Sequence, residues 1–302
     1  MKKIRTLLIG LGNIGFKYDE NSKYIQTHYK AITNNNNFEL IGVIDKNKKR
    51  LRKIKSCYSD TKINKKILTN TDLVILSVPT EIQYKFVQQI LNMGFKKNFL
   101  VEKPFVTDLK RLKEIYKKNK KQKFFINYYR NYDDKLIKCL QKMIKNKNLK
   151  IEAKYSKGFF HNFSHYLNLF IKIFGKIENI QFTKRESLKD DYIANGMIKF
   201  KKLSVSFKNI SDNKDSSFIV LKNNKKIFHY KNDGLKILDK IKKNGLKPNY
   251  NYMTNVYNNI YKTLNKTKSN FYDIESHKKL FENLIKFIWN LKNIIQLEMK
   301  KF

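Results

Sequence analysis

The chain has 302 residues, 41% of them hydrophobic, which is enough apolar chain for two domains and excludes wholesale disorder. Its net charge of +40 would suit a nucleic acid or an anionic membrane, but the lysines are scattered over the whole length, as AT-rich codons would produce. No apolar run reaches the roughly 18 residues of a membrane span, and the two cysteines have neither metal nor disulfide spacing. We therefore expect a cytoplasmic protein with no metal, no membrane contact and no specific nucleic-acid partner.

The first 130 residues alternate apolar runs with helical stretches. The runs show little alternation between polar and apolar residues, which is typical of parallel strands buried on both faces. This pattern predicts a doubly wound α/β domain. The predicted strands are Ile4–Ile9, Phe38–Asp45, Leu73–Val78, Asn98–Val101 and Phe124–Tyr128, and the predicted helices are Glu81–Met93 and Asp108–Asn119.

A glycine-rich turn follows the first predicted strand. Its Gly-x-Gly-x-x-Gly spacing permits a tight turn, a close approach of the backbone to a pyrophosphate, and packing of the next helix on the strand. The turn therefore predicts a dinucleotide site whose contacts come from Gly10, Gly12, Asn13, Ile14 and Gly15.

Asp45 ends the second predicted strand, where a carboxylate accepts hydrogen bonds from the adenosine ribose and so favours NAD. Lys46, Lys49 and Arg50 follow it and could instead hold the 2′-phosphate of NADP. The spacing between the glycine turn and Asp45 is unusually long, which predicts extra residues around Phe16–Thr27.

Two later strand ends carry polar residues at the edge where an open α/β sheet binds its ligand. Ser77 and Pro79 are expected on the nicotinamide side, and Glu102 joins them as a cofactor contact. Lys103 follows Glu102, and an ammonium at a strand end can hydrogen-bond a substrate hydroxyl and stabilise a developing alkoxide.

The second part of the chain changes character. A strand and a helix are followed by successive β-like segments, which predicts an α+β domain with an open, largely antiparallel sheet. We expect a nucleotide-binding domain over 1–130 and a substrate and oligomerisation domain over 131–302, with the C-terminal helices packed back on the first domain. The elements are strands Ile151–Lys157, Ile177–Thr183, Tyr192–Phe200, Leu203–Lys208, Ser216–Leu221 and Lys226–Tyr230, and helices His161–Phe174, Tyr252–Asn265 and Asp273–Met299.

Three segments together resemble the hallmarks of the Gfo/Idh/MocA oxidoreductases, which include glucose–fructose oxidoreductase and inositol dehydrogenase. They are the glycine turn, the Glu102-Lys103-Pro104 triplet and the segment from Gly158 to His165. Asn127-Tyr128-Tyr129-Arg130 resembles the close of that family's nucleotide domain. The resemblance implies a Rossmann domain followed by a domain whose open sheet faces the nicotinamide and commonly pairs with another subunit.

The resemblance also implies roles for individual residues. Lys103 takes the position of the catalytic lysine, often followed by a cis peptide bond, and His165 that of the histidine acting as general base or acid. An imidazole suits this task because its unperturbed pKa is near neutral. The implied substrate contacts are Lys103, Tyr129, Arg130, Asn162, His165 and Asn168.

Four positions depart from the family pattern or stand apart from it. His161 replaces an aspartate one helical turn before His165, so it faces the same way but lacks a fixed negative charge, and we still assign it to the catalytic set. Asn168 replaces a common aspartate, and Gln83 replaces a frequent histidine. His28 lies in the long segment after the glycine turn, and we do not assign it a contact with cofactor or substrate.

The sequence thus predicts an NAD(P)-dependent oxidoreductase acting on a secondary alcohol of a sugar, nucleotide sugar or cyclitol, with surface-polysaccharide metabolism as one setting. The expected partners are a small sugar-like substrate and further copies of the chain. A silent dinucleotide-binding sensor or scaffold is the alternative that His161 leaves open, and a nucleic-acid binder is the alternative that the charge leaves open.

Overall fold

The computed structural model of the protein describes residues 2–54, 57–106, 108–118, 122–145, 149–188, 191–210, 214–231, 234–237 and 249–265. These residues form two compact units. The first holds the chain up to Tyr132 and takes it up again at Tyr250, and the second holds Asp133–Asn249.

The first unit is built on six parallel strands in the order β3-β2-β1-β4-β5-β6. This is the order of dinucleotide-binding folds, and it confirms the predicted doubly wound sheet. The short edge strand β3 was missed because its three residues are polar or aromatic and partly exposed. The strands are β1 Ile4–Ile9, β2 Phe38–Ile44, β3 Tyr58–Asp60, β4 Leu73–Leu76, β5 Asn98–Val101 and β6 Phe124–Ile126.

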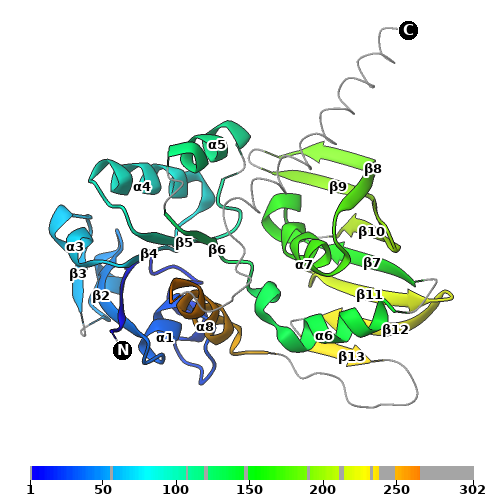
Figure 1. Ribbon diagram of the computed structural model, residues 1–302, viewed down its shortest axis with the longest axis horizontal. Coiled ribbons are helices and arrows are strands. Elements are labelled where there is room, and N and C mark those ends of the chain that lie inside the picture. Colours follow the sequence, from blue (N-terminus) through cyan, green and yellow to red (C-terminus); the bar gives the residue numbers. More distant parts are fainter. Residues whose placement is uncertain are drawn as a thin grey trace, which may run out of the picture. The chain divides into compact units, whose positions relative to one another are not determined.

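Helices cover both faces of this sheet, with α4 and α5 on one face and α1 and α8 on the other (Figure 1). Helix α8 comes from far along the chain, yet its buried Val256, Tyr257 and Ile260 pack in one cluster with Leu8 and Phe38 of the sheet. The helices are α1 His28–Thr33, α2 Lys48–Leu51, α3 Lys65–Asn70, α4 Thr80–Asn92, α5 Leu109–Lys118 and α8 Tyr252–Leu264, with single turns at Lys17–Asp19 and Tyr129–Tyr132.

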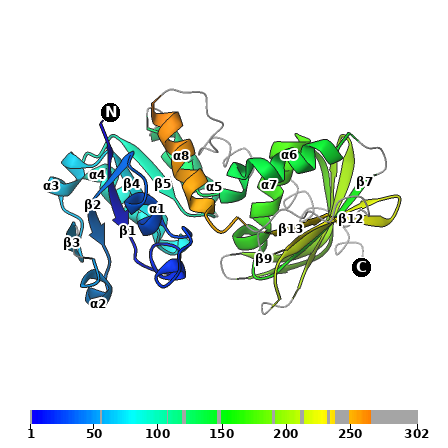
Figure 2. The same cartoon turned by 90° about the horizontal axis from the view of Figure 1, so that it is seen from below.

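The second unit is a seven-stranded sheet in the order β13-β12-β11-β7-β10-β9-β8. All its neighbours are antiparallel except β7 and β10, which confirms the largely antiparallel sheet expected from the sequence. Helices α6 and α7 lie on one face (Figure 2). The elements are α6 Asp134–Met143, α7 Ser164–Phe174, β7 Leu149–Tyr155, β8 Ile177–Ser187, β9 Tyr192–Phe200, β10 Leu203–Asn209, β11 Ser217–Lys222, β12 Lys225–Lys231 and β13 Gly234–Ile237.

One predicted helix is corrected. The helix expected over His161–Phe174 begins instead as a π turn over Phe159–Phe163, and α7 proper starts at Ser164. The wide turn forms because the amide of Phe163 reaches back to the carbonyl of Gly158, five residues away, at 3.4 Å. The helix predicted over Asp273–Met299 lies outside the described residues.

Candidate functional site

The glycine turn after β1 folds tightly onto the neighbouring strand end. Gly10 has a φ of +98°, and a side-chain carbon there would lie 2.4 Å from the carbonyl oxygen of Ser77. A carbon added at Gly15 would lie 2.1 Å from the carbonyl oxygen of Gly10. Both glycines are therefore required by the fold of the turn itself.

Gly12 is different, because a carbon added there meets no atom within 4 Å. The described protein therefore gives no reason for a glycine at this position. Nearby, the buried hydroxyl oxygen of Ser77 has no hydrogen-bond partner among the described atoms. Open space over the middle glycine and an unsatisfied hydroxyl beside the turn fit a bound phosphate, so these residues suit a dinucleotide.

Asp45 is buried at the end of β2 and closes the turn from the side. One carboxylate oxygen accepts the amide of Leu11 at 2.6 Å, and the other accepts the amide of Asn47 at 2.7 Å. The guanidinium of Arg50 lies 3.6 Å away. A carboxylate for a ribose and a cation for a 2′-phosphate thus sit side by side, so the choice between NAD and NADP stays a prediction.

The extra residues expected after the turn interrupt a helix. The amide of His28 donates to the carbonyl of Ile14 at 3.0 Å, and that of Tyr29 donates to Gly15 at 3.0 Å, so α1 continues the turn after an excursion. Buried Asp19 holds this excursion by accepting the amide and hydroxyl of Thr27, both at 2.8 Å.

Lys103 emerges at the same sheet edge as the glycine turn. The amide of Ser77 donates to Ile9 at 2.8 Å and that of Glu102 to Leu76 at 3.3 Å, so the ends of β1, β4 and β5 are joined in sequence. The Lys103–Pro104 peptide bond is cis, as the resemblance implies. Lys103, Ser77 and the glycine turn therefore border one edge of the sheet.

Gln83 holds the backbone on both sides of Lys103. This fully buried side chain accepts the amide of Glu102 at 2.9 Å and donates to the carbonyls of Glu102 and Pro104 at 3.1 and 3.4 Å. The sequence identified Gln83 only as a departure from the family pattern, and its clamping role is visible only in the structure.

Glu102 belongs to a buried polar network. One of its oxygens accepts the amide of Asn127 at 2.6 Å and lies 2.8 Å from Nε2 of His28, whose Nδ1 lies 2.9 Å from the hydroxyl of Tyr257. Burial, and then the charge of Glu102, raise the pKa of Tyr257 well above its usual range. His28 is fully buried, and this network connects α8 to the strand end that carries Lys103.

The remaining predicted residues divide between the two units. In the first unit, the guanidinium of Arg130 lies 4.6 Å from the ring centre of Tyr129. In the second, His165 and Asn168 are buried on α7. The side-chain amide of Asn162 donates to the carbonyl of Ser156 at 2.9 Å, so it ties the π turn to the end of β7. A ligand contact by any of these residues stays a prediction.

Asp191 places a carboxylate beside His161 that the sequence did not predict. Its Oδ2 lies 2.5 Å from Nδ1 of His161, although the two residues are distant in sequence. Asp191 has no local motif, so only the pairing of distant segments could reveal it. Among the described residues no group of acidic, histidine or cysteine side chains could hold a metal ion.

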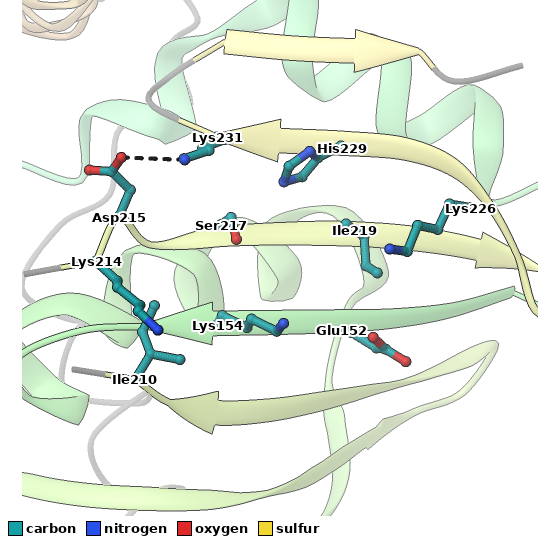
Figure 3. Close-up of a pocket in the computed structure, with 10 residues that line it drawn as sticks. All are labelled: Glu152, Lys154, Ile210, Lys214, Asp215, Ser217, Ile219, Lys226, His229 and Lys231. Carbon is teal, nitrogen blue, oxygen red and sulfur yellow. Dashed lines mark ion pairs between the residues drawn. The ribbon is translucent and has the colours of Figure 1, made fainter.

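A hollow of about 630 Å³ opens on the face of the second sheet that α6 and α7 leave uncovered (Figure 3). The ammonium of Lys231 and the carboxylate of Asp215, both in its lining, form an ion pair at 3.6 Å. None of the predicted site residues lines it, so it is separate from the histidine segment. Its lining is Glu152, Lys154, Ile210, Lys214, Asp215, Ser217, Ile219, Lys226, His229 and Lys231.

A family profile matches the first unit. It is the profile of an oxidoreductase family with an NAD-binding Rossmann fold, and it matches residues 4–129. No curated protein matches the chain. No helix in the described part of the chain is both long and apolar enough to span a bilayer.

Solved structures share the fold over almost the whole chain. A dehydrogenase (MviM) from Clostridium difficile is 16% identical with a TM-score of 0.71, and the match covers 94% of this chain and 99% of that one. The WlbA dehydrogenase from Bordetella pertussis, solved with NADH and UDP-GlcNAcA, is 16% identical with a TM-score of 0.68, covering 96% and 95%. A putative myo-inositol dehydrogenase from Sinorhizobium meliloti 1021 is 15% identical with a TM-score of 0.65, covering 92% and 94%.

Proposed function

Because residues 4–129 belong to the Gfo/Idh/MocA oxidoreductase family, with its NAD-binding Rossmann fold, we propose that the protein is an NAD(P)-dependent oxidoreductase. Its substrate is a secondary alcohol of a sugar, a nucleotide sugar or a cyclitol, or the corresponding ketone. The glycine turn, Ser77 and Asp45 hold the cofactor, whose nicotinamide exchanges a hydride with the substrate carbon when bound.

One observation carries the proposal. Lys103 stands at the sheet edge that also bears the glycine turn and the unsatisfied hydroxyl of Ser77. Ligands of open α/β sheets bind at this edge, outside the carboxyl ends of the strands. A lysine held there by Gln83 can hydrogen-bond the reacting oxygen and stabilise the charge that develops as hydride leaves. A histidine of the second unit, His165 or His161, exchanges the hydroxyl proton.

The substrate class rests on two further considerations. Two proteins of the same fold carry names or ligands of this class, a putative myo-inositol dehydrogenase and a dehydrogenase solved with UDP-GlcNAcA. The strongly basic chain also suits a nucleotide diphosphate, because cations bind phosphate oxygens through charge-assisted hydrogen bonds.

Cofactor binding is the first experiment. The full chain is titrated with NAD and NADP in both redox states, and binding is followed by calorimetry. The loaded protein is then mixed with a panel of nucleotide sugars, free sugars and cyclitols, with turnover followed at the absorbance of the reduced nicotinamide. Failure of both dinucleotides to bind would overturn the proposal.

The Lys103→Ala variant tests the catalytic assignment. We expect roughly a 10²- to 10³-fold loss of kcat with an unchanged cofactor Kd, because the ammonium acts on the developing charge. Lys85→Ala, an exposed lysine on α4, is the matched control and should keep full turnover. Binding of the cofactor with no turnover of any substrate, and no effect of Lys103→Ala, would favour the sensor alternative.

A further inference from the structure

Backbone amides hold the carboxylate of Asp191 in place. It is buried just before β9, where Oδ1 accepts the amides of Phe160 and Tyr192, both at 2.7 Å. Oδ2 accepts the amide of His161 at 2.8 Å and lies 2.5 Å from the Nδ1 of the same residue. Three backbone amides therefore hold the carboxylate beside the imidazole ring.

The carboxylate of Asp191 occupies space that the missing side chain of Gly158 leaves open. A side-chain carbon at Gly158 would lie 1.7 Å from Oδ2 of Asp191, so only glycine permits this position. The fully buried Tyr155 fixes the start of β9, because its hydroxyl donates to the carbonyl of Ala194 at 2.6 Å and accepts the amide of Ala194 at 2.9 Å. Gly158 at the start of the π turn and Tyr155 beside β9 together fix the position of Asp191 between the two elements.

This contact decides which ring nitrogen of His161 can act. A carboxylate can only accept, so in the neutral ring Nδ1 carries the hydrogen and Nε2 is the nitrogen that can take up a proton. The side chain of His161 is 37% exposed, whereas that of Asp191 is 5% exposed. A buried carboxylate therefore orients a partly exposed imidazole, which is the arrangement of an oriented general base.

We propose that His161 and Asp191 form the acid–base pair of the second unit, with His161 as the catalytic residue and Asp191 as its positioning residue. The inference rests on the proposed function. In the oxidation direction, Nε2 of His161 takes the proton of the substrate hydroxyl. The electron pair of the C–H bond leaves as hydride to the nicotinamide of bound NAD(P)⁺, and the carbon–oxygen bond becomes a carbonyl. Reduction reverses both transfers.

His165, one turn further on, is the base that the family resemblance favours. It is 5% exposed, so it is less open to a substrate than His161. The two assignments predict opposite results for the two single substitutions. His161→Asn should lower kcat by roughly 10²- to 10⁴-fold, with less effect from His165→Asn. Loss of turnover in His165→Asn, with turnover kept in His161→Asn, would overturn the inference.

A spectroscopic test needs no turnover. The full chain is labelled with ¹⁵N-histidine, and the ring nitrogens are recorded above the unperturbed histidine pKa of about 6.5, with His161→Asn used to assign the signal. We expect the Nδ1–H tautomer of His161. In Asp191→Asn a single amide oxygen remains to accept the amides of Phe160, Tyr192 and His161 and the Nδ1–H group, so the Nδ1–H tautomer should lose population to the Nε2–H tautomer.

The control is Asp215→Asn, which changes an exposed aspartate of the same unit and should leave the His161 signal unchanged. An Nε2–H tautomer in the unsubstituted protein, or an unchanged ring in folded Asp191→Asn, would overturn the pair. The first of these results is available even if Asp191→Asn does not fold. If the tautomer changes as expected but no dinucleotide binds, the proposed function fails and the pair stands without it.

Discussion

The three glycines of the glycine turn have different surroundings. Gly10 and Gly15 are surrounded by backbone atoms that leave no space for a side chain, and Gly10 also has a left-handed backbone conformation. Gly12 has neither constraint. Gly10 and Gly15 therefore stabilise the fold of the turn, whereas Gly12 has open space beside it.

This contrast gives a prediction for Gly12→Ala. The free energy of unfolding should change by less than about 0.5 kcal/mol, as at an unconstrained surface position. The dinucleotide Kd should rise at least about tenfold, which is ~1.4 kcal/mol of binding free energy, because a methyl group occupies the phosphate space. Chemical denaturation and calorimetric titration measure the two quantities.

Gly10→Ala is the matched comparison. It should destabilise the fold by more than about 1–2 kcal/mol, since alanine resists a positive φ and its methyl group would meet the Ser77 carbonyl. Equal cofactor affinity in Gly12→Ala and the unsubstituted chain would contradict the assignment of that space to a phosphate.

At the scale of elements, one carboxylate joins the amino ends of three parallel strands. Asp72 precedes β4. Its oxygens accept hydrogen bonds from Nε and Nη2 of Arg5 on β1, at 3.0 and 3.2 Å. They also accept one from Nζ of Lys97, which precedes β5, at 2.8 Å. Although burial opposes ionisation, the hydrogen bonds from Arg5 and Lys97 lower the pKa of Asp72 from 3.8 to about 2.

This pKa predicts a stability difference that depends on pH. A lowered folded pKa adds stability that is fully present above the unfolded value of 3.8 and is lost as the pH falls toward about 2. With allowance for partial exposure, Asp72→Asn should cost about 1–2 kcal/mol at neutral pH, and the difference should shrink below pH 4. Urea unfolding at several pH values measures it.

Glu186→Gln is the control for that experiment. Its carboxylate forms an exposed pair with Lys184 at 3.7 Å, which should contribute little at any pH. A cost of Asp72→Asn that stayed constant from neutral pH to pH 2 would show that packing, and not ionisation, accounts for the difference.

Charge dominates the physics of the whole molecule. The chain carries 65 lysines and arginines against 25 acidic residues, which gives a formal net charge of +40. Excess charge of one sign repels itself and destabilises a compact state. Salt that screens this repulsion should therefore stabilise the protein.

We expect the thermal unfolding midpoint to rise as NaCl is increased from about 0.01 M to about 0.15 M, where the Debye length falls from about 30 to about 8 Å. Each kcal/mol gained corresponds to roughly 2–4 °C. Circular dichroism follows the transition. KCl at equal ionic strength should give the same shift, and a midpoint that falls with either salt would contradict self-repulsion as the main effect.

The sequence by itself determined the features that depend on neighbouring residues. Apolar runs predicted the parallel strands, glycine spacing located the glycine turn, and the long gap to Asp45 predicted the extra residues around Phe16–Thr27. Local pattern also placed Lys103 at a strand end, since the position after an apolar run is readable without any partner. The sequence likewise predicted a strand over Ile151–Lys157, which the structure places at Leu149–Tyr155.

Only the tertiary structure decided the contacts between distant segments. Gln83 clamps the backbone around Lys103, Tyr257 of α8 reaches His28, and Asp191 meets His161. The wide turn that replaces the start of α7 also depends on Asp191, which accepts its amides. A hydrogen bond between segments far apart in the chain leaves no period or spacing in the sequence, because its geometry exists only once the strands have paired.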